Sequence, residues 1–402
     1  MLLVSAFAAA GSVEPTIEQR FDAQWRAAGI GSFGLVLRPF VTQEIGFDDN
    51  VFSTRRGVRK DGVSISTAGA TLAPRLDRHA LSVGGSASLI RLLENTGENT
   101  WAGQAFVAGR LDLRDDLQLG IDAVSARVVE ERGNPESLAG AGGPIVALRH
   151  RAEPWLRAET GRFVHRAAIE LQHVTYFDVP AASGGRAFNL AGREYEQAGA
   201  AYRLAYRYVD EDKIYMRLAA FERRALNRAG AATRNLAGGS AALGISGQIT
   251  PVVSGVAAFG VQRIAFDDPR IGDADVATTE LRLSYEPRRW LRFDARYLRD
   301  FAESIVATAD DSSAGYVRSV VALRATAEVR SDLIASAEVL RVERRYLDIA
   351  RNEKLDGVDL GLRYALASGL FLGGSYAFRR ESRDGQRQFT RNVLFTRLTR
   401  AF

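Results

Sequence analysis

Through most of this chain, apolar and polar side chains alternate along segments of about 11–15 residues. Between residues 198 and 208, Tyr202 and Leu204 share one face while Arg203 and Arg207 share the other. Side chains two residues apart on a β-strand point the same way, so each segment is a ribbon with one apolar side. Such segments are longer than the usual strand of about 5–6 residues, and they suit the roughly 9–11 residues that a tilted strand needs to cross a bilayer. The pattern therefore predicts an all-β fold, a transmembrane antiparallel β-barrel.

The connections between these segments alternate in length. Tight polar turns, such as Arg114-Asp115-Asp116 and Thr160-Gly161-Arg162, alternate with longer loops rich in Gly and Asp. Short turns at one end and long loops at the other are typical of outer-membrane barrels, which have an even number of strands. We expect about 18 strands, with both termini on the short-turn side, facing the periplasm. The predicted strands lie near 35–47, 62–75, 78–92, 100–114, 117–130, 144–158, 163–178, 194–208, 213–226, 238–249, 252–265, 276–286, 290–303, 315–329, 333–347, 356–366, 370–381 and 389–402, with long loops near 48–61, 131–143, 179–192, 227–237, 266–275, 304–314 and 349–354.

The two ends of the chain carry candidate sorting signals. Residues 1–10 are apolar and end in Ala8-x-Ala10, which predicts a signal peptide that is truncated because no basic residue precedes the apolar run. The alternative is a disordered terminus. Residues 11–34 are predicted to form a polar periplasmic lead-in, and residues 35–402 the barrel. At the other end, Phe402, Leu398 and Leu394 resemble the C-terminal signal of outer-membrane barrels that is read by the β-barrel assembly machinery, although Arg400 departs from it.

Several other classes of protein fit poorly. The chain contains no cysteine and only four histidines, so we expect no metal, no cofactor and no enzymatic activity. Asp48-Asp49-Asn50 fits a strand-terminating turn better than a calcium site, because no fixed-spacing loop with a following Glu surrounds it. A catalytic triad assembled across strands stays open, but no Gly-x-Ser-x-Gly segment supports one. A soluble propeller would show a blade repeat, and a nucleic-acid partner would need clustered arginines; neither is present.

The face opposite the apolar one should line the lumen, and it is rich in arginine. The predicted inward arginines are Arg110, Arg149, Arg151, Arg157, Arg166, Arg203, Arg207, Arg217, Arg223, Arg282, Arg292, Arg296, Arg318, Arg324, Arg363, Arg379, Arg391 and Arg397. The inward acids are fewer: Asp112, Asp122, Glu153, Glu170, Glu280, Asp294, Glu328, Glu338 and Asp359. A barrel of 16–18 strands can hold an aqueous channel, and an excess of positive charge within low-dielectric walls attracts anions.

Some of these arginines should instead form Arg–carboxylate ladders that stiffen the wall, such as Arg282 with Glu280 and Arg292 with Asp294. We expect an unpaired excess at Arg203, Arg207, Arg217, Arg318, Arg324 and Arg363. The predicted substrate path is Arg203, Arg207, Arg217, Arg282, Arg292, Arg296, Arg318, Arg324 and Arg363. Aromatic residues near the strand ends predict two belts at the membrane interfaces, with Tyr206, Tyr208, Tyr285, Trp290 and Phe371 by the short turns and Trp101, Tyr176, Tyr195, Tyr316 and Tyr346 by the long loops. Some of these residues must instead point into the lumen, where a ring could stack on a sugar.

One segment carries a family resemblance. Residues 31–41 run into Phe47-Asp48-Asp49-Asn50-Val51-Phe52, which is followed by Leu72-Ala73-Pro74 and Arg78-His79-Ala80-Leu81. This arrangement resembles the putative beta-barrel porin family of proteobacterial outer membranes. The resemblance implies an integral outer-membrane barrel with a role in secreting or assembling surface polysaccharide, but it assigns no functional residues.

These observations favour a channel in the Gram-negative outer membrane that exports an extracellular, acidic polysaccharide through an Arg-lined lumen. Its partners would be membrane lipid, the assembly machinery, the polysaccharide and periplasmic export components. One alternative is a general or anion-selective porin for small solutes. Another is a plugged structural or adhesive barrel.

Overall fold

The structure is a computed structural model that describes residues 15–134, 137–138, 140–182, 184, 186–209, 212–226, 234–304, 315–347 and 349–402. The predicted signal peptide at 1–10, and parts of the predicted loops at 131–143, 179–192, 227–237 and 304–314, lie outside these residues. The helical elements are α1 (Ile17–Trp25) and the single 3-10 turns η2 (Thr96–Glu98) and η3 (Ala191–Arg193). The strands are β1 (Ile30–Ser32), β2 (Leu35–Asp48), β3 (Asp61–Pro74), β4 (Ala80–Leu92), β5 (Thr100–Arg114), β6 (Leu117–Val129), β7 (Val146–Thr160), β8 (Phe163–Tyr176), β9 (Tyr195–Val209), β10 (Asp212–Ala225), β11 (Leu236–Thr250), β12 (Val253–Phe266), β13 (Ala274–Arg288), β14 (Leu291–Glu303), β15 (Gly315–Arg330), β16 (Leu333–Tyr346), β17 (Asn352–Ala367), β18 (Leu370–Arg383) and β19 (Gln386–Ala401).

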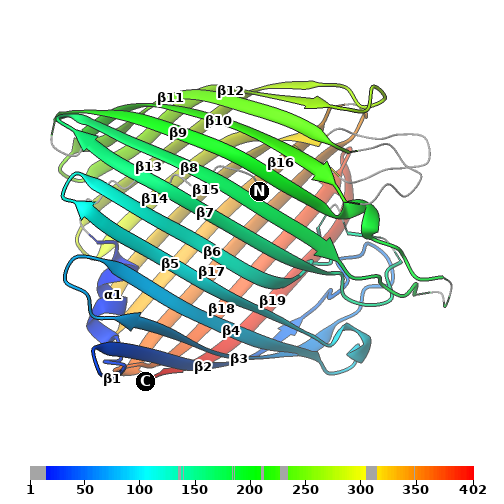
Figure 1. Ribbon diagram of the computed structural model, residues 1–402. Coiled ribbons are helices and arrows are strands. Elements are labelled where there is room, and N and C mark those ends of the chain that lie inside the picture. The colour runs from blue at the N-terminus through cyan, green and yellow to red at the C-terminus, as the bar shows by residue number, and fades with distance from the viewer. Residues whose placement is uncertain are drawn as a thin grey trace.

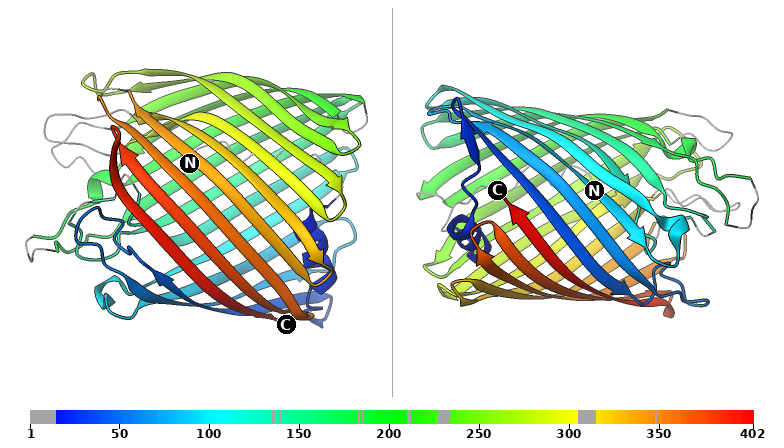
Figure 2. Two further views of the ribbon diagram at one scale, coloured as in Figure 1. Left: turned by 180° about the vertical axis from the view of Figure 1, so that it is seen from behind. Right: turned by 90° about the horizontal axis from the view of Figure 1, so that it is seen from below.

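Strands β2 to β19 form one closed antiparallel sheet (Figure 1). Each strand pairs with its neighbours in the chain, and β19 pairs back with β2. This confirms the predicted barrel of eighteen strands, whose bounds differ from the predicted ones by at most about four residues. The short strand β1, which was not predicted, pairs only with β2 in the described residues. Both the start of β2 and the end of β19 lie at the end of the barrel that carries the short turns (Figure 2).

Exposed apolar side chains cover the outward face of the middle of the barrel. They include Leu243, Phe259, Leu323 and Leu362, each of which alternates along its strand with an inward residue. Such a wall buries no side chains against a second sheet, as expected for a barrel whose outside faces lipid. No helix among the described residues combines the length and apolarity of a membrane span.

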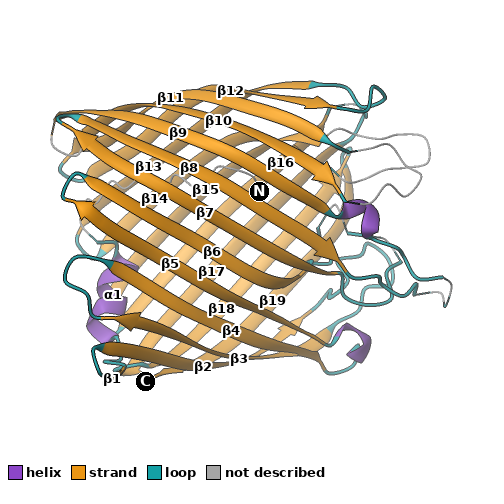
Figure 3. Cartoon of the chain, viewed as in Figure 1, coloured by secondary structure: helices purple, strands orange, loops and turns teal. Residues whose placement is uncertain are grey.

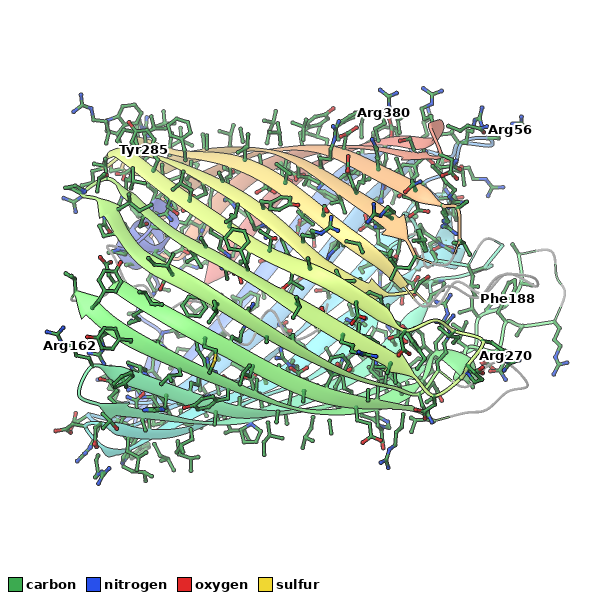
Figure 4. All side chains as sticks on the ribbon, turned by 90° about the horizontal axis from the view of Figure 1, so that it is seen from above. Arg56, Arg162, Phe188, Arg270, Tyr285 and Arg380 are labelled. Carbon is green, nitrogen blue, oxygen red and sulfur yellow. The ribbon has the colours of Figure 1, made fainter. Side chains whose placement is uncertain are left out.

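Aromatic residues lie on the outside of the short-turn end at β9, β13 and the β13–β14 turn. Tyr206, Tyr208, Tyr285 and Trp290 are exposed on the outside there, and Tyr285 stacks on Phe293 across the β13–β14 pair (Figure 4). These positions fit the interfacial belt predicted for that end.

The belt predicted at the long-loop end is wrong for most of its members. Trp101 is exposed on the outside, but Tyr176, Tyr195, Tyr316 and Tyr346 lie on the lumen face of their strands. Phe371, which was predicted for the other belt, also points inward and is buried. Nearness to a strand end does not fix the face, because the face depends on whether a residue is an odd or an even step from its neighbours.

The turn that follows β2 closes the barrel. Asp48 is buried and accepts from Arg391 of β19 at 2.6 Å, while Asp49 accepts from the backbone N–H of Asn392 at 2.7 Å. Asn50 is also buried, and its backbone N–H donates to Asp48 at 2.9 Å. This agrees with the strand-terminating turn favoured above, and the three side chains fasten the first barrel strand to the last.

Candidate functional site

The strand register brings the predicted arginines together on the lumen face. Arg157, Arg166, Arg203 and Arg217 follow one another across β7, β8, β9 and β10 as directly paired residues. The strand register also places the other members of the predicted path on the lumen face: Arg207, Arg282, Arg292, Arg296, Arg318, Arg324 and Arg363. The lumen therefore carries the charges that the alternation predicts, whereas their role in transport stays a prediction.

The predicted unpaired excess is wrong for five of its six arginines, which have carboxylate partners. The pairs are Arg207 with Glu159, Arg217 with Glu280 at 3.5 Å, Arg318 with Asp300 at 2.6 Å, Arg324 with Glu18 at 3.0 Å and Arg363 with Asp22 at 2.6 Å. Four of these five acids were missing from the predicted lumen set. Two lie near strand ends, and the other two lie on a helix that the alternation did not predict. The positive excess of the lumen is therefore smaller than the sequence suggested.

Within the described residues, Arg149, Arg203 and Arg296 are lumen arginines without a carboxylate partner. Arg203 lies over the ring of Tyr215 at 4.0 Å. Its paired neighbours on both sides are cationic, namely Arg166 and Arg217. Arg296 is paired with Arg282 in the register. The guanidinium groups of these arginines are available to a passing anion. Three of the predicted lumen acids, Asp122, Glu328 and Glu338, also form no ion pair with a described residue.

Other lumen charges form ladders that stabilise the wall, as the structural reading expects. Glu153 is buried and accepts from Arg151 at 2.8 Å and from Arg166 at 3.2 Å, and Arg151 also reaches Glu170 at 3.2 Å. The pairs proposed from the sequence are also present, Arg282 with Glu280 and Arg292 with Asp294, each at 2.9 Å. These carboxylates neutralise their partners, so they contribute more to rigidity than to ion selection.

At the long-loop end, two opposite parts of the wall meet across the lumen. Arg223 of β10 forms a buried ion pair with Glu303, at the end of β14, although β11, β12 and β13 separate these two strands in the sheet. Phe301 and Val317 pack with Phe221 in one buried apolar cluster. The ends of β14 and β15 therefore lie against the inner face of β10 to β13 and narrow the lumen.

A cavity of about 400 Å³ remains beside this contact. Arg149, Tyr176 and Tyr195 line it from one wall, and Tyr316 and Arg318 line it from the other. Three phenol rings and the unpaired guanidinium of Arg149 thus line a space of small-molecule size. The acids that also line it, Glu130, Glu131 and Glu303, form ion pairs with other arginines. Some aromatic rings were expected to point into the lumen, but these three tyrosines were not singled out; strand parity, counted from the inward arginines, is the signal that could have identified them.

At the short-turn end, α1 lies inside the mouth of the barrel (Figure 3). Thr16 and Gln19 form a reciprocal capping box at its start. Ile17 and Phe21 are buried against an inward cluster that includes Phe371. Glu18 and Asp22 of the helix form ion pairs with Arg324 and Arg363. The Trp25 indole donates to the Ser331 carbonyl in the β15–β16 turn, and the Trp25 carbonyl accepts from the backbone N–H of Gly369 in the β17–β18 turn.

The polar lead-in predicted at 11–34 contains helix α1, which the sequence analysis did not predict. The apolar spacing Ile17, Phe21 and Trp25, together with Thr16 three residues before Gln19, was the available signal. Among the described residues, no group of three or more His, Asp and Glu side chains has a metal-binding arrangement.

Comparison with known proteins gives one family. The family described as putative beta-barrel porin 2 matches residues 22–402. No curated protein sequence matches the chain. Among solved structures, the outer membrane protein OpdK from Pseudomonas aeruginosa is 12% identical, with 91% of this chain and 99% of that chain covered and a TM-score of 0.49. OccK9 (OpdG) from the same organism is 13% identical, with 92% and 98% covered and a TM-score of 0.49. OccAB4 from Acinetobacter baumannii is 10% identical, with 91% and 98% covered and a TM-score of 0.48.

Proposed function

Because the chain belongs to the putative beta-barrel porin 2 family and forms a β-barrel channel of the bacterial outer membrane, we propose that it conducts small anionic solutes by passive diffusion. The observation that carries the proposal is the set of three lumen arginines, Arg149, Arg203 and Arg296, that have no carboxylate partner in the described part of the chain. An uncompensated guanidinium in a narrow aqueous pore lowers the energy of an anion there and raises that of a cation.

The shape of the lumen favours small solutes over a polymer. The wall contact between Arg223 and Glu303 narrows the lumen at the long-loop end, and α1 occupies part of the opposite mouth. A polysaccharide in transit needs a wide and continuous path at both of these places. Polysaccharide export, which the sequence favoured, also finds no support among the comparisons.

Aromatic rings add a second preference at the narrow end. Tyr176, Tyr195 and Tyr316 line the cavity beside Arg149. A ring can stack on a planar or sugar-like solute while the guanidinium binds its carboxylate or phosphate. We therefore expect solutes that combine one negative charge with a flat or cyclic body to pass best.

Replacing Arg149, Arg203 and Arg296 together by glutamine should reduce the preference for anions, because each change removes a positive charge that is not held in an ion pair. The measurement is the reversal potential of single channels in a planar bilayer under a salt gradient. We expect the variant to move most of the way toward equal permeability for chloride and potassium, with its conductance largely retained.

The matched control is the triple replacement of Arg345, Arg380 and Arg387 by glutamine, which removes the same charge from the outside of the barrel. Its reversal potential should equal that of the unmodified protein. An unchanged reversal potential in the lumen variant would refute the proposed role of the three arginines. Adding an acidic polysaccharide tests the export alternative, which requires the polymer to enter and block the pore, whereas our proposal requires that it does not.

A further inference from the structure

A group of cationic side chains lies on the outside of the barrel, at the long-loop ends of β16 to β19. We call Arg341, Arg345, Lys354, Arg380 and Arg387 the outward cationic patch. They belong to four neighbouring strands and occupy the face opposite the lumen, where Figure 4 shows Arg380 directed away from the wall. Arg341 and Arg380 are both paired with Asp356 in the register, so paired side chains here lie within about 5 Å at their Cβ atoms.

The acids of this region neutralise only part of the patch. Arg341 forms an ion pair with Asp356 at 2.7 Å, and Lys354 lies 3.6 Å from Glu343. Arg345, Arg380 and Arg387 have no side-chain hydrogen bond or ion pair with any described residue. The patch therefore presents three free guanidinium groups, which favour phosphate because of their planar, forked donors.

An apolar wall begins immediately beside the patch. Val339, Val358 and Phe378 are paired across three neighbouring strands and form a continuous outward row. This row lies two residues along the strands from Arg341 and Arg380. The next outward row consists of Leu360, Tyr376 and Leu394. Val339, Leu360 and Leu394 are about half exposed, as lipid-facing residues should be.

We propose that this surface binds a phosphate-bearing anionic lipid in the leaflet next to the long-loop end. The head group would accept hydrogen bonds from Arg345, Arg380 and Arg387, while the acyl chains would lie along the two apolar rows. A soluble anion could satisfy the guanidinium groups but would leave the apolar rows unused. An anionic lipid fits both features, because its charged head group is joined to hydrocarbon chains just as the guanidinium groups lie beside the apolar rows.

The proposal is tested by native mass spectrometry of the purified full chain with added phosphatidylglycerol. Phosphatidylcholine and inorganic phosphate, added at the same concentration, are the comparison ligands. We expect retained phosphatidylglycerol on the unmodified protein, with much less of either comparison ligand. Each basic residue near a membrane surface strengthens binding to anionic lipid by roughly fivefold. The triple replacement of Arg345, Arg380 and Arg387 by glutamine should therefore weaken phosphatidylglycerol binding on the order of a hundredfold.

The matched control is the triple replacement of Arg162, Arg288 and Arg289 by glutamine. These exposed side chains lie at short turns, at the opposite end of the barrel from the patch, so phosphatidylglycerol binding should stay within about threefold of the unmodified protein. Folding of each variant is checked by its heat-dependent mobility on gels, which is independent of lipid. Equal retention of phosphatidylcholine would overturn the proposal, as would equal retention of inorganic phosphate. So would a patch variant that folds normally and still binds phosphatidylglycerol as tightly as the control.

Discussion

Replacing Asp48 by alanine should lower the free energy of unfolding of the barrel by about 3–5 kcal/mol. The Asp48 carboxylate is buried and receives two bonds from Arg391, at 2.6 and 2.9 Å. Without it, the Arg391 guanidinium retains only the exposed Glu131 as an acidic partner within the described residues. The same carboxylate orders the turn by accepting from the backbone N–H of Asn50. The lost stabilisation affects the seam where β2 pairs with β19 and closes the barrel.

Urea unfolding in detergent micelles, followed by intrinsic fluorescence, measures this change. The matched control is Asp116→Ala, which removes a carboxylate from an exposed ion pair with Arg114 at a short turn. Exposed pairs contribute about 0–1 kcal/mol, so this control should leave the unfolding midpoint nearly unchanged. If Asp48→Ala were no more destabilising than Asp116→Ala, the seam would not depend on the buried turn.

Replacing Phe21 by glutamate should release α1 from the barrel mouth and increase the single-channel conductance. Phe21 is buried against Phe371, with ring centroids 6.2 Å apart. Removing a fully buried aromatic side chain costs about 1.5–3 kcal/mol, which changes the ratio of docked to undocked helix by roughly tenfold to more than a hundredfold. The buried charge of the new side chain adds to this cost.

Gln24→Glu is the control for this variant, because it adds the same charge to the exposed face of the same helix. Its conductance should match that of the unmodified protein. A conductance that is the same in Phe21→Glu and Gln24→Glu, with both proteins folded, would show that α1 does not restrict the pore.

The sequence predicted the parts of this structure that depend on local period. Alternation along a strand depends only on residues within that strand, so the eighteen strands and the inward set of arginines could be read directly. The lengths of the connections are also a local property of the sequence, and they predicted that both ends of the barrel chain lie at the short-turn end. That this end faces the periplasm, and that Phe402, Leu398 and Leu394 are read by the assembly machinery, stay predictions.

The features that control the pore depend on contacts between distant residues. Arg223 meets Glu303 across the lumen, and Arg324 meets Glu18 of α1, although neither pair lies on adjacent strands. Alternation gives the face of a residue but not its partner, and therefore it overestimated the number of unpaired arginines. The ion pair between Asp48 and Arg391 at the β2–β19 seam could not be predicted either, because these two residues lie near opposite ends of the chain.

The most direct test of the account is the reversal potential of the unmodified protein in a planar bilayer separating concentrated from dilute potassium chloride. The predicted result is single channels whose reversal potential has the sign that marks chloride as the more permeant ion, because the guanidinium groups of Arg149, Arg203 and Arg296 in the lumen form no ion pair with a described carboxylate. A channel that prefers potassium, or a correctly folded barrel that conducts no current, would contradict the account.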